Sequence, residues 1–206
     1  LWNIIAKTAK DRRLYKDYKV VPWCPRCGTS LSSHELAQGY EDVKDLSITA
    51  KFELVDELGT YLLAWTTTPW TLPGNVALAI GKDIQYGIYE KGSEKVILAD
   101  ARAQSVLGEE WSRKGGVDVN TLVGKKYKPL YPFLQLKPGN KRTEELDQTF
   151  RIHEAKFVTT EDGTGLVHCA PGHGKEDYEV GKEYGLDMPS PVELDGKLTI
   201  ETGKYA

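Results

Sequence analysis

The sequence of 206 residues has few of the features that mark several broad classes of protein. Its three cysteines are too few for the disulfide framework of a small extracellular domain. No apolar run approaches the roughly 20 residues of a membrane-spanning helix, and we find no internal repeat. The formal net charge of −3 excludes a strongly basic nucleic-acid coat, so any RNA contact must be focal. We therefore expect a cytoplasmic protein without a membrane contact and with one main core.

The pattern along the chain divides it into three parts. Residues 1–45 predict a short amphipathic helix and then a turn-rich connector, in which Cys24-Pro25-Arg26-Cys27-Gly28 has the form of a zinc knuckle. Residues 46–194 contain short runs of Ile, Val, Tyr and Leu separated by turn residues, which is typical of strands. Residues 195–206 form a return connector. The chain begins at Leu1 without an initiator methionine, which is typical of an excised fragment.

These runs predict an α+β fold that is mostly β, with a barrel-like body, a few peripheral helices and the small Cys-x-x-Cys module. We expect strands at residues 46–54, 61–66, 76–80, 86–89, 95–98, 150–158 and 165–169. We expect helices at residues 100–107 and 175–184. The polar loop at 128–149 is long enough to be a mobile surface excursion.

The stretch "GTGLVHCAPGHGKEDYEVG", residues 163–181, combines glycines with polar side chains. It predicts a strand that carries His168 to its end, a tight turn through Gly172, and a helix with Asp177 in its first turn. His168 and Asp177 then face one pocket, in which a carboxylate can bind an ammonium group. Two other interpretations remain open. The helix dipole alone favours Asp177, and His168, His173 and Asp177 include metal-ligand types, although no His-x-x-x-His pattern accompanies them.

A second stretch, "LLAWTTTPWTLPGNVALAI" at residues 62–80, joins two apolar runs through consecutive threonines and prolines. Alternation along a strand sends Thr66 and Thr68 to one face and Thr67 to the other. The prolines favour an irregular loop, in which hydroxyls and free backbone N–H groups converge on a ligand. Such donors suit a ribose, an ester carbonyl or a water molecule. The alternative is an exposed strand face, because threonine has a high β-propensity.

The stretches "WTTTPWTLPGN", "GTGLVHCAPGHGKED" and "CPRCGTSLSSHE" together resemble the connective-peptide (CP1) editing domain of the isoleucyl-tRNA synthetase family. The resemblance covers essentially the whole chain. The related valyl and leucyl domains carry Thr-Thr-Arg-Pro where this chain has Thr67-Thr68-Pro69 preceded by Thr66. The nucleotide-binding signatures of the ATP-dependent ligase, His-Ile-Gly-His and Lys-Met-Ser-Lys-Ser, are absent from the sequence, so this segment cannot make an aminoacyl-adenylate.

The resemblance implies a hydrolytic proofreading activity in protein biosynthesis. Discrimination of isoleucine from valine is the standard example of a limit on recognition, because a pocket that fits isoleucine also admits valine. A second site that is too small for isoleucine then hydrolyses valine from Val-tRNA(Ile) after transfer, or from Val-AMP before it. The implied partners are these two substrates and the rest of the synthetase, and we expect a monomer. No cofactor is expected for editing.

The resemblance also assigns roles to residues. It implies that Asp177 binds the α-ammonium group of the misactivated amino acid and that His168 stands beside the side chain and excludes isoleucine. It places the ester, the terminal adenosine and the attacking water on the threonine-rich stretch, with residues Thr66, Thr67, Thr68, Thr71 and Asn75. Trp65 shapes the pocket, and the glycine-rich turn adds Gly172 and His173 to the substrate-binding residues. No general base is obvious, so a substrate hydroxyl can assist.

Cys24 and Cys27 supply half of a four-ligand structural zinc site. In the resembling family the second cysteine pair lies beyond the editing domain, so zinc is a structural candidate for the full-length enzyme. His34 is a conceivable third ligand and, alternatively, a surface histidine. Two rival functions also remain: a free-standing deacylase that acts in trans, and a noncatalytic tRNA-binding module that uses basic residues at 7–19 and Lys125, Lys126 and Lys128.

Overall fold

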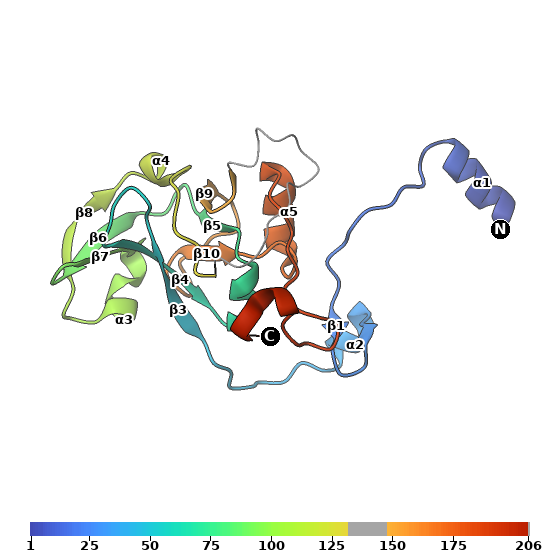
Figure 1. The fold of residues 1–206 in the computed structure, drawn as a ribbon, viewed down its shortest axis with the longest axis horizontal. Coiled ribbons are helices and arrows are strands. Elements are labelled where there is room, and N and C mark those ends of the chain that lie inside the picture. Colours follow the sequence, from blue (N-terminus) through green and yellow to red (C-terminus); the bar gives the residue numbers. More distant parts are fainter. Residues whose placement is uncertain (132–147, 206) are drawn as a thin grey trace.

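Two open β-sheets form the body of the computed structural model, which describes residues 1–131 and 148–205 (Figure 1). The five-stranded sheet has the order β3-β4-β7-β6-β8. Its strands are Ile48–Glu53 (β3), Thr60–Thr66 (β4), Tyr86–Lys91 (β6), Glu94–Ala99 (β7) and Ser112–Val117 (β8). The three-stranded sheet, in the order β10-β5-β9, consists of Ala77–Ile80 (β5), Arg151–Glu154 (β9) and Leu166–Cys169 (β10). Most of the loop expected at 128–149 lies outside the described residues.

Short helices connect and flank the sheets. The α-helices are Trp2–Lys10 (α1), Ser33–Ala37 (α2), Ala103–Leu107 (α3), Val119–Leu122 (α4) and Lys175–Tyr184 (α5). The 3-10 helices are Pro69–Gly74 (η1), Asp100–Arg102 (η2) and Ile200–Tyr205 (η4). Strands Trp23–Cys24 (β1) and Thr29–Ser30 (β2) form a small hairpin at the Cys-x-x-Cys turn. No helix in the described ranges is long and apolar enough to cross a membrane.

The α+β class and the excess of strand over helix are confirmed, but the expected barrel is wrong. The two sheets stay open and separate within the described residues, with β3 and β8 at the edges of one and β9 and β10 at the edges of the other. The chain passes from β4 in the larger sheet to β5 in the smaller one through η1. Pro69 and Pro73 in η1 lack backbone N–H donors and so interrupt the ladder at this crossing.

Two hydrophobic clusters hold the body together. The larger one lies against the five-stranded sheet and contains Phe52, whose ring meets Tyr127 edge to face at 5.2 Å. The smaller cluster joins the three-stranded sheet to α5, with Val180 of the helix packed near Cys169 of β10. Burial of these side chains fixes α5 beside the end of β10. The two halves of the glycine-rich stretch are thereby brought together in space.

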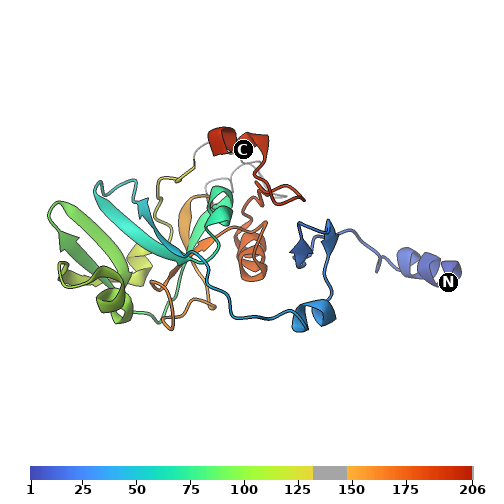
Figure 2. The same ribbon diagram turned by 90° about the horizontal axis from the view of Figure 1, so that it is seen from below.

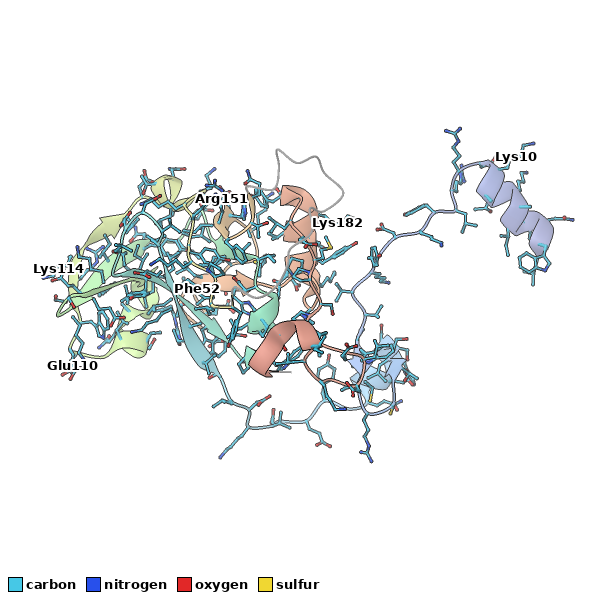
Figure 3. All side chains as sticks on the ribbon, viewed as in Figure 1. Lys10, Phe52, Glu110, Lys114, Arg151 and Lys182 are labelled. Atoms are coloured by element: carbon cyan, nitrogen blue, oxygen red, sulfur yellow. The ribbon has the colours of Figure 1, made fainter. Side chains whose placement is uncertain are left out.

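The N-terminal segment, which we define as residues 1–47, is held differently. None of its residues is buried, and α1 stands well away from the body in both ribbon views (Figures 1 and 2). Figure 3 places Phe52 within the body and Lys10 on the distant helix. Among the described residues, two hydrogen bonds and an ion pair tie the segment to the body. Trp23 Nε1 donates to the Leu194 carbonyl at 2.8 Å, Tyr178 Oη donates to the Tyr18 carbonyl at 2.9 Å, and Lys182 Nζ lies 3.6 Å from Asp17 Oδ2.

Candidate functional site

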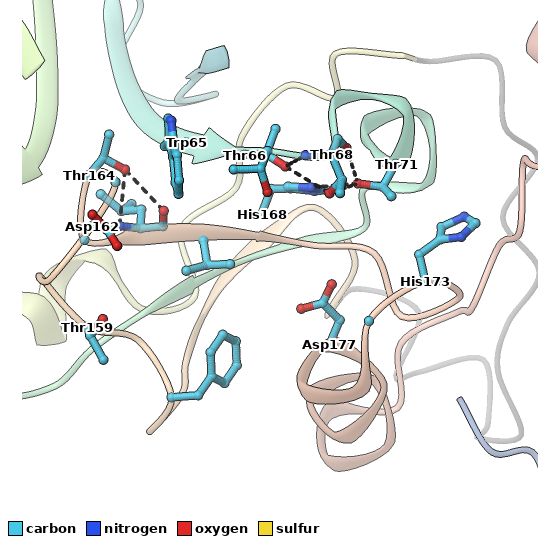
Figure 4. A pocket seen from close by; sticks show the side chains of 17 residues that line it. Trp65, Thr66, Thr68, Thr71, Thr159, Asp162, Thr164, His168, His173 and Asp177 are labelled. Carbon is cyan, nitrogen blue, oxygen red and sulfur yellow. Dashed lines mark hydrogen bonds between the residues drawn. The ribbon is translucent and has the colours of Figure 1, made fainter. Parts of the chain in front are cut away.

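A cavity of about 330 Å³ lies where the end of β4, the strand β10 and the start of α5 meet (Figure 4). Its lining includes eight of the ten residues predicted for the catalytic and substrate-binding site. These are Trp65, Thr66, Thr67, Thr68, Thr71, His168, His173 and Asp177. Asn75 and Gly172 are not among the lining residues. The structure therefore brings the two sequence stretches to one cavity, although they lie about a hundred positions apart.

The threonines form a connected group of hydroxyls at the end of β4. Thr66 Oγ1 accepts from the backbone N–H of Thr68 at 3.1 Å, and the two hydroxyl oxygens lie 3.3 Å apart. Thr71 Oγ1 donates to the Thr68 carbonyl at 2.8 Å. Pro69 opens η1 directly after Thr68 and fixes the backbone φ there. The cavity thus has a neutral wall whose hydroxyls are positioned before any ligand arrives.

His168 is buried in this wall, with 6% of its surface exposed. Strand β10 pairs with β5 so that His168 lies opposite Leu78, and its Nε2 is 3.0 Å from Thr71 Oγ1. Burial, and to a lesser degree the nearby His173, lower the pKa of His168 to about 4. The imidazole is consequently neutral near pH 7, and it is a weak base there. Its Nδ1 has no hydrogen-bond partner among the described residues.

Asp177 lies in the first turn of α5 and faces the same cavity. Its Oδ2 accepts the backbone N–H of Ala170 at 3.0 Å. A Cβ atom at Gly174 would lie only 2.7 Å from this Oδ2, so a side chain at that position would displace the Asp177 carboxylate from its present place. Burial raises the pKa of Asp177, and the Ala170 N–H opposes this shift. No lysine or arginine in the described parts of the chain forms an ion pair with Asp177.

His173 closes the cavity on the side of α5. Its ring meets that of Trp70 edge to face, with centroids 5.5 Å apart. Its Cδ2 lies close to Gly74, where a Cβ atom would approach it to 3.4 Å. Burial lowers the pKa of His173, so this side chain also favours the neutral form. The two histidines therefore add no positive charge that would compete with a cationic ligand for Asp177.

The far wall of the cavity lies at residues 157–165, and the sequence patterns indicated only its last part, at 163–165. Its lining residues are Phe157, Thr159, Asp162, Gly163, Thr164 and Gly165. Gly163 and Gly165 have φ angles of +69° and +77°, so the turn uses a backbone conformation that other residues rarely adopt. The signal that could have found this wall is "EDGTG", where two glycines in close succession bracket a buried threonine.

Asn75 and Gly172 contact segments that do not line the cavity. The Asn75 side chain is buried, donates to the Ala77 carbonyl at 2.8 Å and accepts from Tyr127 Oη at 2.7 Å. A Cβ atom at Gly172 would lie 2.5 Å from the Pro189 carbonyl oxygen. Both residues thus join the cavity loops to neighbouring segments.

The Cys24 and Cys27 side chains share one tight turn, in which the Cys27 N–H donates to Cys24 Sγ at 3.3 Å. This N–H lowers the pKa of the Cys24 thiol, as suits a thiolate ligand. No group of three or more potential metal ligands occurs within residues 1–131 and 148–205. His34 Nε2 instead contacts Gln38 Nε2 at 3.0 Å. The two thiols therefore fit half of a structural zinc site and would need two further ligands.

The basic residues that suggested an RNA-binding patch are partly neutralised. Lys125 forms an ion pair with Glu57, and Lys128 forms one with Glu53 at 2.6 Å. These contacts reduce the local excess of positive charge near β3. The structure thus gives the noncatalytic RNA-binding alternative less support than the sequence did.

Both the sequence and the fold of this chain are similar to those of known proteins. No protein-family model matches the chain. An isoleucine–tRNA ligase of Thermoplasma acidophilum is 47% identical over 199 residues, which is 96% of this chain and 18% of that ligase, so the chain spans under a fifth of its relative. The crystal structure of GlLeuRS-CP1 matches 71% of the chain and 70% of its own length, with a TM-score of 0.54 and 19% identity. The crystal structure of the editing domain of P. knowlesi cytosolic leucyl-tRNA synthetase matches 82% of this chain and 78% of its own length, with a TM-score of 0.53 and 12% identity. The chain corresponds to a segment of isoleucine–tRNA ligases, and its fold is that of the connective-peptide (CP1) editing domains of leucyl-tRNA synthetases.

Proposed function

We propose that this chain is the hydrolytic editing site for valine that has been wrongly attached to tRNA(Ile), with Val-AMP as a second substrate. The observation that carries the proposal is the position of Asp177, a partly buried carboxylate in the same cavity as the threonine hydroxyls. An aminoacyl ester needs this combination, because it has a cationic α-ammonium group close to a neutral carbonyl. Editing of this kind belongs in the cytoplasm, and the tRNA 3′ end and the remaining part of the synthetase are the proposed partners.

Asp177 binds the α-ammonium group of the amino acid in this proposal. The raised pKa of Asp177 reflects the loss of water around its carboxylate, and an ammonium partner compensates for that loss. Its Oδ2 is already fixed by the Ala170 N–H, so the carboxylate is oriented before the substrate binds. Charge pairing at this point places the ester carbonyl toward the threonine wall.

The threonine wall then orients water and stabilises the oxyanion that develops on the ester carbonyl. Thr66 and Thr68 present hydroxyls at the end of β4, and Thr67 lies between them. An ester is reactive enough for donors of this kind to supply much of the acceleration. His168, with a pKa of about 4, is too weak a base near pH 7 to remove a proton efficiently. A hydroxyl of the substrate ribose is the remaining candidate for that step.

Rejection of isoleucine depends on a rigid boundary. Burial of one additional methylene contributes only about 0.8 kcal/mol, so attraction cannot separate the two amino acids. A wall that cannot move can exclude the larger side chain. His168 is held by Thr71 on one side of the cavity, and Gly163 packs against Trp65 on another, where a Cβ atom would approach the indole to 3.1 Å.

A deacylation assay with purified chain tests the proposal. Val-tRNA(Ile) and Ile-tRNA(Ile) are compared, each against spontaneous hydrolysis without protein. We expect release of valine and no acceleration for isoleucine. Equal hydrolysis of both esters would refute the size-selective assignment. Tight binding of tRNA with no hydrolysis of either ester would instead favour the RNA-binding module.

A further inference from the structure

Asp162 is a second acidic side chain in the cavity, and it has no role in the mechanism above. It lines the cavity from the far wall and is exposed, whereas Asp177 is partly buried. Figure 4 shows the two carboxylates well separated, with Asp162 beside Trp65 and Thr164 and with Asp177 nearer to His173. Within the described residues Asp162 forms no ion pair. Its oxygens are therefore available to a ligand.

The backbone on both sides of Asp162 is fixed by a single side chain. Arg102 Nε donates to the Gly163 carbonyl at 3.0 Å, and Arg102 Nη1 donates to the Glu161 carbonyl at 3.1 Å. Hydrogen bonds from a charged group are stronger than neutral ones, and this pair clamps the turn from η2. The Nε and Nη1 groups of Arg102 thus donate to backbone carbonyls, and within the described residues Arg102 forms no ion pair with the Asp162 carboxylate.

Close packing fixes the rest of the same turn. A Cβ atom at Gly165 would lie 2.4 Å from the Ala99 Cβ, so the turn sits directly on the end of β7. Thr164 is buried, and its hydroxyl donates to the Leu63 carbonyl of β4 at 2.6 Å. An exposed carboxylate on so rigid a turn is pre-organised, which reduces the entropy that a ligand contact would otherwise cost.

The difference in burial between the two carboxylates indicates which end of an aminoacyl-tRNA lies at each of them. The amino acid is the small end of an aminoacyl-tRNA, and the remainder of the polynucleotide must stay outside the cavity. The partly buried Asp177 consequently lies at the amino-acid end and the exposed Asp162 at the nucleotide end. The groups of the terminal nucleotide nearest the ester are the sugar hydroxyls. A carboxylate accepts hydrogen bonds from hydroxyls, as acidic residues do for ribose in dinucleotide-binding folds.

We propose that Asp162 accepts a hydrogen bond from the unesterified hydroxyl of the terminal ribose, and that Arg102 is the positioning residue that holds Asp162 in place. The proposal rests on the assignment of aminoacyl esters as substrates. It gives the cavity a contact at each end of the ester: the ammonium group at Asp177 and the vicinal hydroxyl at Asp162.

The test measures binding, so that it does not depend on hydrolysis. The probes are two non-hydrolysable amides, 3′-valylamido-3′-deoxyadenosine, which keeps its 2′-hydroxyl, and the same molecule without that hydroxyl. Calorimetric titration of wild type, Asp162→Ala and Asp162→Asn gives a dissociation constant for each pair. We expect wild type to bind the hydroxyl-bearing amide about 10- to 100-fold more tightly, because a charged acceptor would otherwise lose its partner. Both variants should bind the two amides within about threefold of each other.

Glu161→Gln is the matched control, because it removes the same charge one residue away. The Glu161 side chain is not part of the cavity lining, so this variant should keep the full preference for the hydroxyl. Arg102→Ala should weaken the preference in the wild-type background and add nothing to Asp162→Ala, since it acts through that residue. Arg102→Lys should recover only part of it, because an ammonium cannot reproduce the two-pronged contact.

Three results would overturn the inference, and they are distinguishable. If wild type binds both amides equally well, the hydroxyl contact is absent while the aminoacyl assignment survives. If wild type binds neither amide and also fails to release valine from Val-tRNA(Ile), the proposed function fails and the inference with it. A loss of the preference in Glu161→Gln as large as in Asp162→Ala would reduce the effect to long-range charge, which also contradicts a direct contact.

Discussion

The body and the N-terminal segment differ in what specifies their structure. In the body, buried side chains from both sheets form two clusters, and every lining residue of the cavity comes from this part of the chain. In the N-terminal segment, order is mainly local. Ser32 and Glu35 cap α2 reciprocally, and among the described residues two hydrogen bonds and one exposed ion pair reach the body. The candidate site thus lies in the part of the molecule whose geometry is fixed by packing.

The largest expected effect compares two aromatic truncations. Phe52 of β3 is fully buried and its ring packs against Tyr127, so Phe52→Ala should lower the free energy of unfolding by about 3–5 kcal/mol. Trp2 on α1 is 82% exposed, so Trp2→Ala should change it by less than about 0.5 kcal/mol. Urea denaturation followed by circular dichroism measures both. A comparable loss from Trp2→Ala would show that α1 packs on the body in solution and would remove the contrast.

The next effect separates function from stability within the body. Asp177→Asn keeps the shape and the acceptor for Ala170 N–H but removes the charge that the ammonium group needs. We expect valyl-ester hydrolysis to lose about 2–5 kcal/mol of transition-state stabilisation, which is a loss of kcat/KM of roughly 30-fold or more. An N-acetylated valyl ester, which has no ammonium group, serves as the control substrate. On that substrate the variant and wild type should be equally slow, and an unequal result would point to a role in water activation.

Although Asp177→Asn should lower activity, it should not lower the free energy of unfolding at pH 7. Burial raises the folded-state pKa of Asp177 above its unfolded value, so the folded protein binds this proton more tightly. Wild-type stability from this group is therefore greatest at acid pH and falls as pH rises through the folded pKa. Asparagine has no such titration, so the variant should be at least as stable as wild type at pH 7. Denaturant midpoints measured between pH 4 and pH 7 check this, and a less stable variant at pH 7 would contradict the desolvation argument.

Much of the secondary structure could be predicted because it depends on local patterns. Helix α5 at Lys175–Tyr184 matches its predicted range, and seven predicted strands are present with ends shifted by a few residues. Strand β8 was missed because "SRKGGV" has no apolar alternation; it forms because β6 pairs with it through a bulge. Helix 100–107 divides into η2 and α3. Whether sheets close into a barrel depends on pairing between distant strands, which no local pattern encodes.

The candidate site was predictable where residue types were unusual and hidden where they were ordinary. Three threonines in succession and a glycine-rich turn before Asp177 are conspicuous in sequence, and the structure brings them to one cavity. Asp162 carries no motif, and its position depends on contacts to Arg102 some sixty residues earlier. Asn75 lies next to the threonine stretch in sequence, but its buried side chain points to Tyr127 instead. Proximity in sequence does not fix the direction of a side chain once the chain leaves a strand.

The smallest expected effect concerns the Cys24–Cys27 turn in the N-terminal segment. No cysteine lines the cavity. Among the described residues, the turn approaches the body where Trp23 Nε1 donates to the Leu194 carbonyl and where Pro25 lies close to Gly196. We therefore expect Cys24→Ser with Cys27→Ser, or prolonged treatment with a chelator, to leave valyl-ester hydrolysis within about twofold of the untreated chain, because the mechanism proposed above uses hydroxyls and a carboxylate. Measuring metal content beside activity separates the two possible consequences. Loss of bound zinc with unchanged hydrolysis would assign the metal to the local turn. Loss of hydrolysis with an unchanged circular dichroism spectrum would instead show that the turn affects the cavity, and that the two regions are not independent.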